Sequence, residues 1–164
     1  MARKAGGGTP ATDALQAAGV PFALRAYEHD PRVTSYGMEA AQALGVDPDR
    51  VFKTLLVDIG STSPQLAVGV VPVTGRLDLK ALAGALGAKR AVMADPAAAA
   101  RATGYVVGGI SPIGQRTLLP TVVDETAVLH ETILVSGGKR GLDVELAPDD
   151  LVALLSASYA DIAR

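Results

Sequence analysis

The chain has 164 residues, a length typical of one domain, and its composition of 49% hydrophobic and 20% charged residues indicates a well-filled core. Lys and Arg number 15 against 17 Asp and Glu, so a net charge of −2 excludes a chain-wide basic surface and a long acidic tail. Cysteine is absent, which excludes disulfides, thiolate metal sites and a cysteine nucleophile.

The N-terminal segment predicts neither secretion nor membrane insertion. Residues 1–8 combine two basic residues with three consecutive glycines in place of an apolar segment, so we expect a flexible N-terminal arm. No apolar run reaches the roughly 18 residues of a membrane-spanning helix. We therefore expect a cytoplasmic protein with no membrane partner and with one domain over residues 9–164.

The first elements are predicted to be a helix, a strand and a second helix. Thr9 and Pro10 are typical of a helix start, with a hydroxyl cap followed by proline in the first turn. Residues 22–26 alternate between apolar and more exposed positions, which predicts a strand. A second helix is expected to begin at a cap near Ser35 and to end at Gly45.

Residues 51–59 form the clearest predicted strand. Because side chains alternate between the two faces of a strand, Lys53 shares its face with four aliphatic residues. A turn is expected over residues 60–64, and the apolar residues 66–73 predict a second strand that forms a hairpin with the first.

The rest of the chain alternates between short helices and strands. Asp78 is predicted to cap one helix, and Asp95 with Pro96 to open an alanine-rich one that ends near Gly104. Strands are predicted over residues 91–94, 119–123, 132–136 and 142–146, and a last helix after Pro148. Short connections without strict βαβ alternation favour a single α+β (mixed α/β) domain, with helices flanking a largely antiparallel sheet.

Several common kinds of site are excluded by the sequence. The two histidines, His29 and His130, lack zinc-ligand spacing, and we interpret both as ordinary loop residues. Neither a nucleophile elbow nor a dinucleotide-binding fingerprint is present. Residues 137–141 look like a phosphate loop, but Arg140 stands where that motif needs Ser or Thr. We expect no metal and no cofactor.

Lys53 is the first of three features that carry candidate chemistry. Its aliphatic stem could cover apolar surface while its ammonium reaches water, and the pattern alone favours this interpretation. The alternative is an ammonium at the mouth of an apolar pocket, where it would stabilise negative charge that develops on a carbonyl oxygen.

The other two features are glycine-rich segments. Residues 103–112 contain two adjacent glycines and are either an ordinary turn or a loop whose bare N–H groups bind an anion. Residues 136–143 are either a hairpin loop with solvated charges or a loop that directs Lys139 and Arg140 toward phosphates.

Taken together, these segments resemble the YbaK-like Cys-tRNA(Pro) deacylases, which are freestanding relatives of the editing insertion of bacterial prolyl-tRNA synthetase. The resemblance runs in one register from about Thr9 to Arg164. The segments that carry it are residues 27–30, 51–57, 94–96, 103–114 and 135–146. It implies a bent mixed sheet with flanking helices around a pocket.

The resemblance also implies a function and a set of site residues. The implied reaction is hydrolysis of cysteine mischarged onto tRNA(Pro), with some tolerance of Cys-tRNA(Cys). Lys53 matches the family's essential lysine, and we expect Gly108 to take part in catalysis. The implied substrate-binding residues are Tyr27, Thr54, Gly109, Ile110, Ser111, Pro112, Ser136 and Asp143. We expect Lys139 and Arg140 to contact tRNA phosphates, and prolyl-tRNA synthetase to be a candidate partner that supplies the choice of tRNA.

A hydrolase without cysteine, triad or metal site needs an activated water or a nucleophile from the substrate. The resemblance implies the second route, in which the cysteine thiol attacks its own ester carbonyl and releases the tRNA 3′ end. Lys53 and the N–H groups around Gly108 would then position the substrate and stabilise the oxyanion. Three alternatives stay open: water-based deacylation of another mischarged tRNA such as Ala-tRNA(Pro), a non-catalytic module that binds an aminoacyl-CCA end or a nucleotide, and a plain partner-binding domain.

Overall fold

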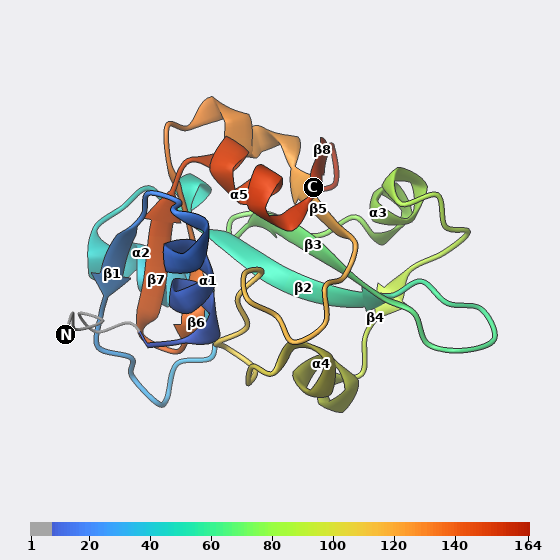
Figure 1. The fold of residues 1–164 in the computed structure, drawn as a ribbon, viewed down its shortest axis with the longest axis horizontal. Coiled ribbons are helices and arrows are strands. Elements are labelled where there is room, and N and C mark those ends of the chain that lie inside the picture. The colour runs from blue at the N-terminus through green and yellow to red at the C-terminus, as the bar shows by residue number, and fades with distance from the viewer. Residues whose placement is uncertain (1–7) are drawn as a thin grey trace.

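The computed structural model describes residues 8–164, and its framework is two β-sheets that meet at an angle (Figure 1). The arm predicted over residues 1–8 lies outside the described residues, except for Gly8. The smaller sheet has the order β1 (Ala23–Ala26), β7 (Leu142–Leu146) and β6 (Ile133–Lys139). The larger sheet has the order β4 (Val92–Met93), β2 (Phe52–Asp58), β3 (Leu66–Pro72), β5 (Thr121–Asp124) and β8 (Ser158–Ala160).

Short helices surround the two sheets. They are α1 (Pro10–Ala18), α2 (Tyr36–Leu44), α3 (Leu79–Ala85), α4 (Pro96–Thr103) and α5 (Pro148–Leu155), with 3-10 turns η1 (Pro48–Arg50) and η2 (Glu125–Leu129). The caps predicted at Thr9, Asp78 and Asp95 are confirmed, because each side chain accepts a hydrogen bond from a first-turn N–H. Ser35 also precedes its helix, but its hydroxyl makes no cap hydrogen bond.

The predicted hairpin is confirmed, and the larger sheet is mixed. β2 and β3 pair antiparallel along their whole length, whereas β3–β5 and β5–β8 pair parallel. β8 was not predicted, because a strand of three residues that pairs with a distant parallel neighbour leaves no alternation in its own sequence. A single parallel bridge between Val51 and Leu134 joins the two sheets.

The β6–β7 connection is tighter than the predicted loop. β6 continues beyond Ser136 through a bulge to Lys139, which pairs with Leu142, so only Arg140 and Gly141 form the turn. Gly141 has a φ of +83°, a conformation that favours glycine. The carbonyl of Gly137, in the bulge, accepts a hydrogen bond from Thr9 and ties α1 to this sheet.

Both faces of β2 are buried, which confirms the predicted alternation. Phe52 and Leu56 pack into the largest core cluster, between β2 and the smaller sheet, while Val57 lies in a second cluster with α3 and the C-terminal segment. Lys53 is therefore on the face of β2 that also carries aliphatic side chains. Within residues 8–164, no helix is long and apolar enough to cross a membrane.

Candidate active site

A pocket of about 510 Å³ lies where the two sheets meet. Its walls come from β2, the start of α2, the segment from β4 into α4, the glycine loop after α4, and the pocket-facing positions of β6 and β7. The lining residues are 27, 34–38, 51–56, 73, 93, 94, 96, 99, 107, 108, 110, 136 and 143. The pocket thus unites segments that are far apart in the chain.

The pocket follows the edge of β2 that β4 leaves uncovered. β4 pairs with β2 only at Val57 and Asp58, and one further bond joins the Ala94 N–H to the Leu56 carbonyl at 3.0 Å. Beyond that point the chain turns away into α4, which leaves residues 52–55 in the pocket wall. The shortness of β4 is therefore what opens the site.

Lys53 lies half-buried in this wall without a counter-ion. Among residues 8–164, its ammonium has no hydrogen bond and no ion pair. Burial, reinforced by the positive charge of Arg76, lowers the pKa of Lys53 below its ordinary value. An ammonium placed in this way gains more than a surface lysine would from a negatively charged ligand.

Thr54, the next residue in the wall, carries a buried hydroxyl with no partner. Its Oγ1 is the one buried side-chain polar atom of residues 8–164 that lacks a hydrogen bond. Leaving such a group unpaired costs about 1–3 kcal/mol. Thr54 is also one of the residues that line the pocket.

Asp143 contributes an unpaired carboxylate from the opposite wall. The residue is 6% exposed, and among residues 8–164 its side chain makes no hydrogen bond. Burial raises the pKa of Asp143 to about 7, although the charge of Arg25 opposes this shift. Arg25 lies opposite Asp143 in β1, but its guanidinium bonds Glu145 instead.

Tyr27 follows β1 and presents its phenol beside Asp143. Burial, together with the negative charge of Asp143, raises the pKa of Tyr27 to about 12. The phenol is therefore a neutral hydrogen-bonding group at physiological pH. The Tyr27 N–H donates to the Gly141 carbonyl at 2.9 Å, which ties this residue to the β6–β7 turn.

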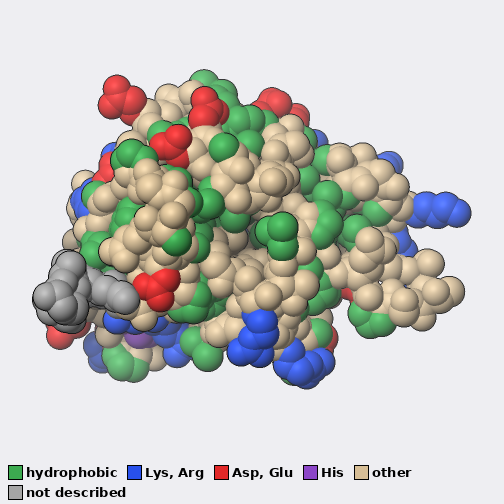
Figure 2. Space-filling view, viewed as in Figure 1, with side chains coloured by type: hydrophobic (Ala, Val, Ile, Leu, Met, Phe, Trp, Pro, Cys, Tyr) green, Lys and Arg blue, Asp and Glu red, His purple; other side chains and the backbone are tan. Residues whose placement is uncertain are grey.

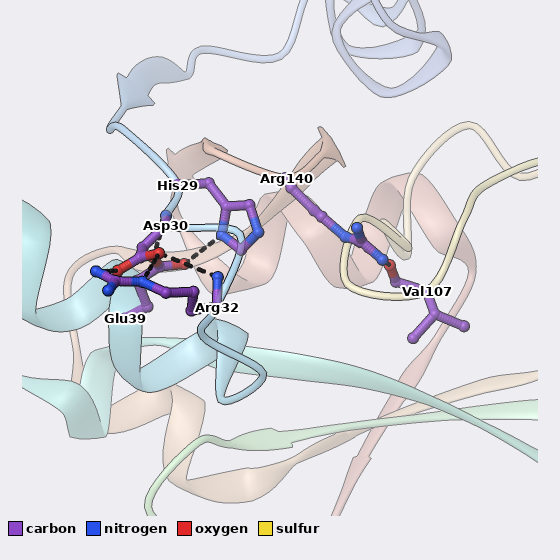
Figure 3. Close-up of polar contacts among 6 residues, drawn as sticks. All are labelled: His29, Asp30, Arg32, Glu39, Val107 and Arg140. Atoms are coloured by element: carbon purple, nitrogen blue, oxygen red, sulfur yellow. Dashed lines mark hydrogen bonds and ion pairs between the residues drawn. The ribbon is translucent and has the colours of Figure 1, made fainter.

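The glycine loop closes the pocket with a tight turn. The Gly109 N–H donates to the Val106 carbonyl at 2.9 Å, and Gly108 between them has a φ of +87°. The Arg140 guanidinium donates to the Val107 carbonyl from Nε at 2.9 Å and from Nη2 at 2.6 Å (Figure 3). The same guanidinium lies over the Tyr36 ring, 5.1 Å from its centre.

A polar cluster next to the pocket is internally satisfied (Figure 3). His29 Nδ1 lies 2.7 Å from Glu39 Oε1, and the Asp30 N–H donates to the other oxygen of Glu39 at 2.8 Å. Arg32 pairs in turn with Asp30. These bonds fasten the segment after β1 to α2, and His29 is not in the pocket lining, which agrees with its interpretation as a loop residue.

The structure brings seven of the predicted site residues together and leaves five outside the pocket. Those in the lining are Tyr27, Lys53, Thr54, Gly108, Ile110, Ser136 and Asp143. Those outside it are Gly109, Ser111, Pro112, Lys139 and Arg140. The role of each residue in binding or catalysis stays a prediction.

The five residues outside the pocket lie in packed positions or on the surface. A Cβ on Gly109 would lie 2.9 Å from Lys139 Cα, so Gly109 packs against the β6–β7 turn. Ser111 is fully buried, and its hydroxyl accepts a hydrogen bond from the Ile113 N–H at 3.1 Å. Pro112 lines a separate, smaller pocket. Lys139 and Arg140 are exposed, although the Arg140 guanidinium contacts Val107 and Tyr36 of the lining.

Sequence reasoning missed much of the apolar lining. Tyr36 and Met93 line the pocket, yet nothing in their local pattern marks them. For Val107 a signal was available, because two adjacent valines directly precede the two glycines of the loop, and in the structure Val107 is 49% exposed and lines the pocket. Within the described chain, no three His, Cys, Asp or Glu side chains are grouped to hold a metal ion.

Comparisons with known proteins find similarity to proteins that are described as tRNA-editing domains or deacylases. A family model described as the aminoacyl-tRNA editing domain matches residues 30–154. A protein of Enterococcus faecalis, EbsC, named as a candidate Cys-tRNA(Pro)/Cys-tRNA(Cys) deacylase, is 41% identical over 122 residues, which cover 74% of this chain and 73% of that protein.

Solved structures share the fold over nearly the whole chain. A crystal structure described as a candidate trans-editing enzyme for prolyl-tRNA synthetase has a TM-score of 0.81 and 27% identity, covering 94% of this chain and 95% of the other. The hypothetical protein APE2540 has a TM-score of 0.82 and 26% identity, covering 94% and 99% of the two chains. The predicted fold class is confirmed.

Proposed function

Because the chain belongs to the aminoacyl-tRNA editing domain family, we propose that it deacylates cysteine mischarged onto tRNA(Pro), through attack by the substrate's own thiol. The observation that carries this proposal is a pocket lined by Lys53 and Asp143, whose ammonium and carboxylate have no partners among residues 8–164, with the unpaired Thr54 hydroxyl next to it in β2. An aminoacyl ester supplies complementary groups: an α-ammonium, a carbonyl oxygen and a side chain.

Asp143 is the group suited to the α-ammonium. The residue is only 6% exposed and its carboxylate has no hydrogen-bond partner among residues 8–164, so a substrate cation would supply a counter-ion and favour the ionised form. Tyr27 and Ser136 line the same wall and offer neutral hydrogen-bonding groups beside it. This wall would hold the amino acid by a feature that every aminoacyl-tRNA shares.

Lys53 and Gly108 are suited to the carbonyl end of the ester. When the thiol attacks, a C–S bond forms and the carbonyl oxygen gains negative charge, which the Lys53 ammonium and the Gly108 N–H would stabilise. The C–O bond to the terminal ribose then breaks, the ribose oxygen takes a proton, and a cyclic thioester of cysteine leaves. Water opens this thioester to free cysteine.

A requirement for sulfur would explain selectivity that the pocket cannot obtain from size. Alanine and serine are no larger than cysteine, and size differences of this order separate substrates by only about 10–200-fold. A thiol with a pKa near 8.5 is a few per cent thiolate at neutral pH, whereas a serine hydroxyl is not ionised. The amino acid would therefore be selected by reactivity.

The surface charge suits weak docking of the tRNA backbone. Acidic side chains lie along the top of the molecule, over α5 and η2, while Lys and Arg side chains lie along the lower edge, near α4 (Figure 2). The start of α4 lines the pocket, so phosphates near the CCA end would meet the basic edge. With a net charge of −2, we propose that prolyl-tRNA synthetase supplies most of the tRNA choice, in the cytoplasm.

The test is a comparison of deacylation rates for Cys-, Ser- and Ala-tRNA(Pro), with S-alkylated Cys-tRNA(Pro) as the control for the thiol. We expect a preference for cysteine over serine above about 200-fold, beyond what size can give, and no hydrolysis of the alkylated substrate. Equal rates for cysteine and serine would reject the thiol mechanism. A preference for Ala-tRNA(Pro) would instead support the water-based alternative, with Lys53 and Gly108 orienting a water molecule.

A further inference from the structure

We propose that Arg140 is a positioning residue, which fixes the orientation of the Val107–Gly108 peptide so that the Gly108 N–H is presented to the reacting carbonyl. The inference rests on the proposed function, because that function gives the N–H its task. It assigns to Arg140 a role different from the phosphate contact that its sequence context suggests.

The glycine loop adopts a defined type of β-turn. The hydrogen bond from the Gly109 N–H to the Val106 carbonyl defines a β-turn with Val107 and Gly108 at its centre. Gly108 has a φ of +87°, and Val107 is not among the residues with positive φ. These values identify a type II turn. Rotating its central peptide by half a turn would give type I, with the carbonyl and the N–H exchanged.

The contacts of the Val107–Gly108 peptide fix its direction. The described chain contains no cis peptide bond, so the Val107 carbonyl and the Gly108 N–H point in opposite directions. The Arg140 guanidinium donates two hydrogen bonds to the Val107 carbonyl, of 2.9 and 2.6 Å. The Gly108 N–H must therefore point away from Arg140, and among residues 8–164 it has no hydrogen-bond partner. Gly108 itself lies in the pocket wall.

Arg140 is held firmly by its own surroundings, so it can serve as an anchor for the glycine loop. Arg140 belongs to the two-residue β6–β7 turn, which is closed by the pairing of Lys139 with Leu142 and joined to Tyr27 through the Gly141 carbonyl. Its guanidinium also lies over the Tyr36 ring. A Cβ on Gly108 would come within 2.8 Å of both Arg140 Nε and the Tyr36 ring, so the loop has little freedom to move against this anchor.

Kinetics can separate positioning from phosphate binding. Arg140→Ala should lower kcat for Cys-tRNA(Pro) by about 10–100-fold, because a lost oxyanion donor costs ~10²–10³ and a released peptide still samples the active orientation. KM and its salt dependence should change less than twofold. Arg140→Lys should restore part of kcat, since its ammonium can still donate to the Val107 carbonyl.

Two neighbouring cations serve as controls. Arg32 is 88% exposed and pairs with Asp30, so Arg32→Ala should leave kcat and KM unchanged. Lys139→Ala removes the adjacent charge. If Lys139 contacts a tRNA phosphate, this variant should raise KM and weaken its salt dependence, which is the signature expected for loss of a phosphate contact. If Arg140→Ala behaves as Lys139→Ala does, with kcat unchanged, the positioning role is wrong.

A spectroscopic measurement tests the contact without any activity. In ¹⁵N–¹H spectra of the full chain, Arg140→Ala should shift the Gly108 amide signal and speed its hydrogen exchange, whereas Arg32→Ala should not. An unchanged Gly108 signal overturns the inference even if the enzyme is active. If wild-type protein does not hydrolyse Cys-tRNA(Pro), the proposed function fails, while the Gly108 signal still decides whether Arg140 holds the loop. Arg140→Met, which keeps most of the side-chain stem but has no N–H donor for the Val107 carbonyl, gives the same readout should Arg140→Ala fail to fold.

Discussion

Asp143 and Glu145 are acidic residues on the same face of β7, two positions apart, and their surroundings are opposite. Glu145 accepts hydrogen bonds from Arg25, from Arg50 and from Thr132, which together lower its pKa, with the Thr132 hydroxyl making the largest contribution. Asp143 has no such partner in the part of the chain that the structure describes, and burial raises its pKa to about 7.

The difference distinguishes the pocket from the frame of the molecule, by which we mean the paired polar groups around Glu145. Arg50 reaches Glu145 from η1, so the satisfied carboxylate joins the smaller sheet to the chain that enters β2. At the pocket, the side chains of Asp143, Lys53 and Thr54 have no hydrogen-bond partner among residues 8–164. Polar groups that stabilise the fold are thus paired within it. The unpaired groups at the pocket instead lower the free energy of unfolding, and they are available to bind a ligand. Substitutions in the frame should therefore lower the free energy of unfolding and leave activity intact, whereas substitutions in the pocket should lower activity without lowering stability much.

The largest expected effect is that of Lys53→Ala on activity. Removing the ammonium should lower kcat for Cys-tRNA(Pro) by at least about 10³-fold, or roughly 4 kcal/mol of transition-state stabilisation. Because Lys53 has no partner within the described chain, the free energy of unfolding should change by only about 1 kcal/mol. Single-turnover deacylation and thermal unfolding provide the two measurements.

The control for Lys53 is the conservative variant. Lys53→Arg keeps the charge, but its planar fork should not replace a compact ammonium in the wall, so activity should stay low. Retention of most activity by Lys53→Ala would show that the ammonium is only a solvated side chain covering apolar surface.

Asp143→Asn should combine a loss of activity with a gain of stability. We expect kcat/KM to fall by about 10–100-fold, because the α-ammonium loses its counter-ion. The folded pKa of Asp143 is raised, so its ionisation destabilises the folded state increasingly as pH rises from its unfolded pKa to about 7. Asn does not titrate, and the variant should be more stable than wild type by roughly 2–4 kcal/mol above pH 7, with little difference near pH 4.

Urea unfolding of both proteins at several pH values measures that difference. A stability gap that does not grow between pH 4 and 7 would mean that Asp143 titrates normally in the folded protein. The prediction for binding would then lose its basis as well.

Glu145→Gln should produce the reverse result at the frame. Losing the charge weakens its hydrogen bonds to Arg25 and Arg50, which should lower the free energy of unfolding by about 2 kcal/mol at pH 7. The pKa of Glu145 is lowered in the folded state, so the deficit should shrink as pH falls below its unfolded value. Activity measured below the unfolding temperature should change less than twofold, and a large loss would contradict the separation of frame from pocket.

The smallest effect is expected for Thr54→Val. This change removes a buried hydroxyl that lacks a partner while keeping the shape of the side chain, so stability should rise by about 1 kcal/mol. Activity should fall by roughly 10-fold if the substrate supplies the missing hydrogen bond. Calorimetry and steady-state kinetics on the same preparation would show whether the two changes occur together; a variant that loses stability would indicate that the hydroxyl is already satisfied in the folded protein.

Local chemistry made much of the fold predictable. The caps at Thr9, Asp78 and Asp95 mark helix starts, because a side chain that satisfies first-turn N–H groups acts within its own segment. The alternation along β2 likewise places Lys53 on an aliphatic face. For the site, the resemblance indicated seven residues that the pocket does bring together.

What could not be predicted depends on distant contacts. The separation into two sheets follows from the short pairing of β4 and the single bridge at Val51, and neither leaves a pattern in the sequence. The hydrogen bonds of Arg140 to the Val107 carbonyl join residues that only the folded chain brings close. The burial of Asp143 without a hydrogen-bond partner among residues 8–164 likewise depends on the surroundings that the fold gives it. Sequence patterns identify which groups are polar, whereas the fold decides which of them remain unpaired.

The order of the strands has a consequence for the speed of folding. β1 pairs with β7, so Ala23 lies opposite Glu145, and the smaller sheet cannot close until most of the chain has been gathered. Pairings between residues so distant in sequence are typical of slow folding, because loop-closure entropy is lost before the contacts form. The pocket takes Tyr27 from the residue after β1 and Asp143 from β7, which are neighbours in the sheet but distant in sequence, so its formation coincides with this slow closure. We therefore expect no partially folded form of this protein to bind an aminoacyl ester.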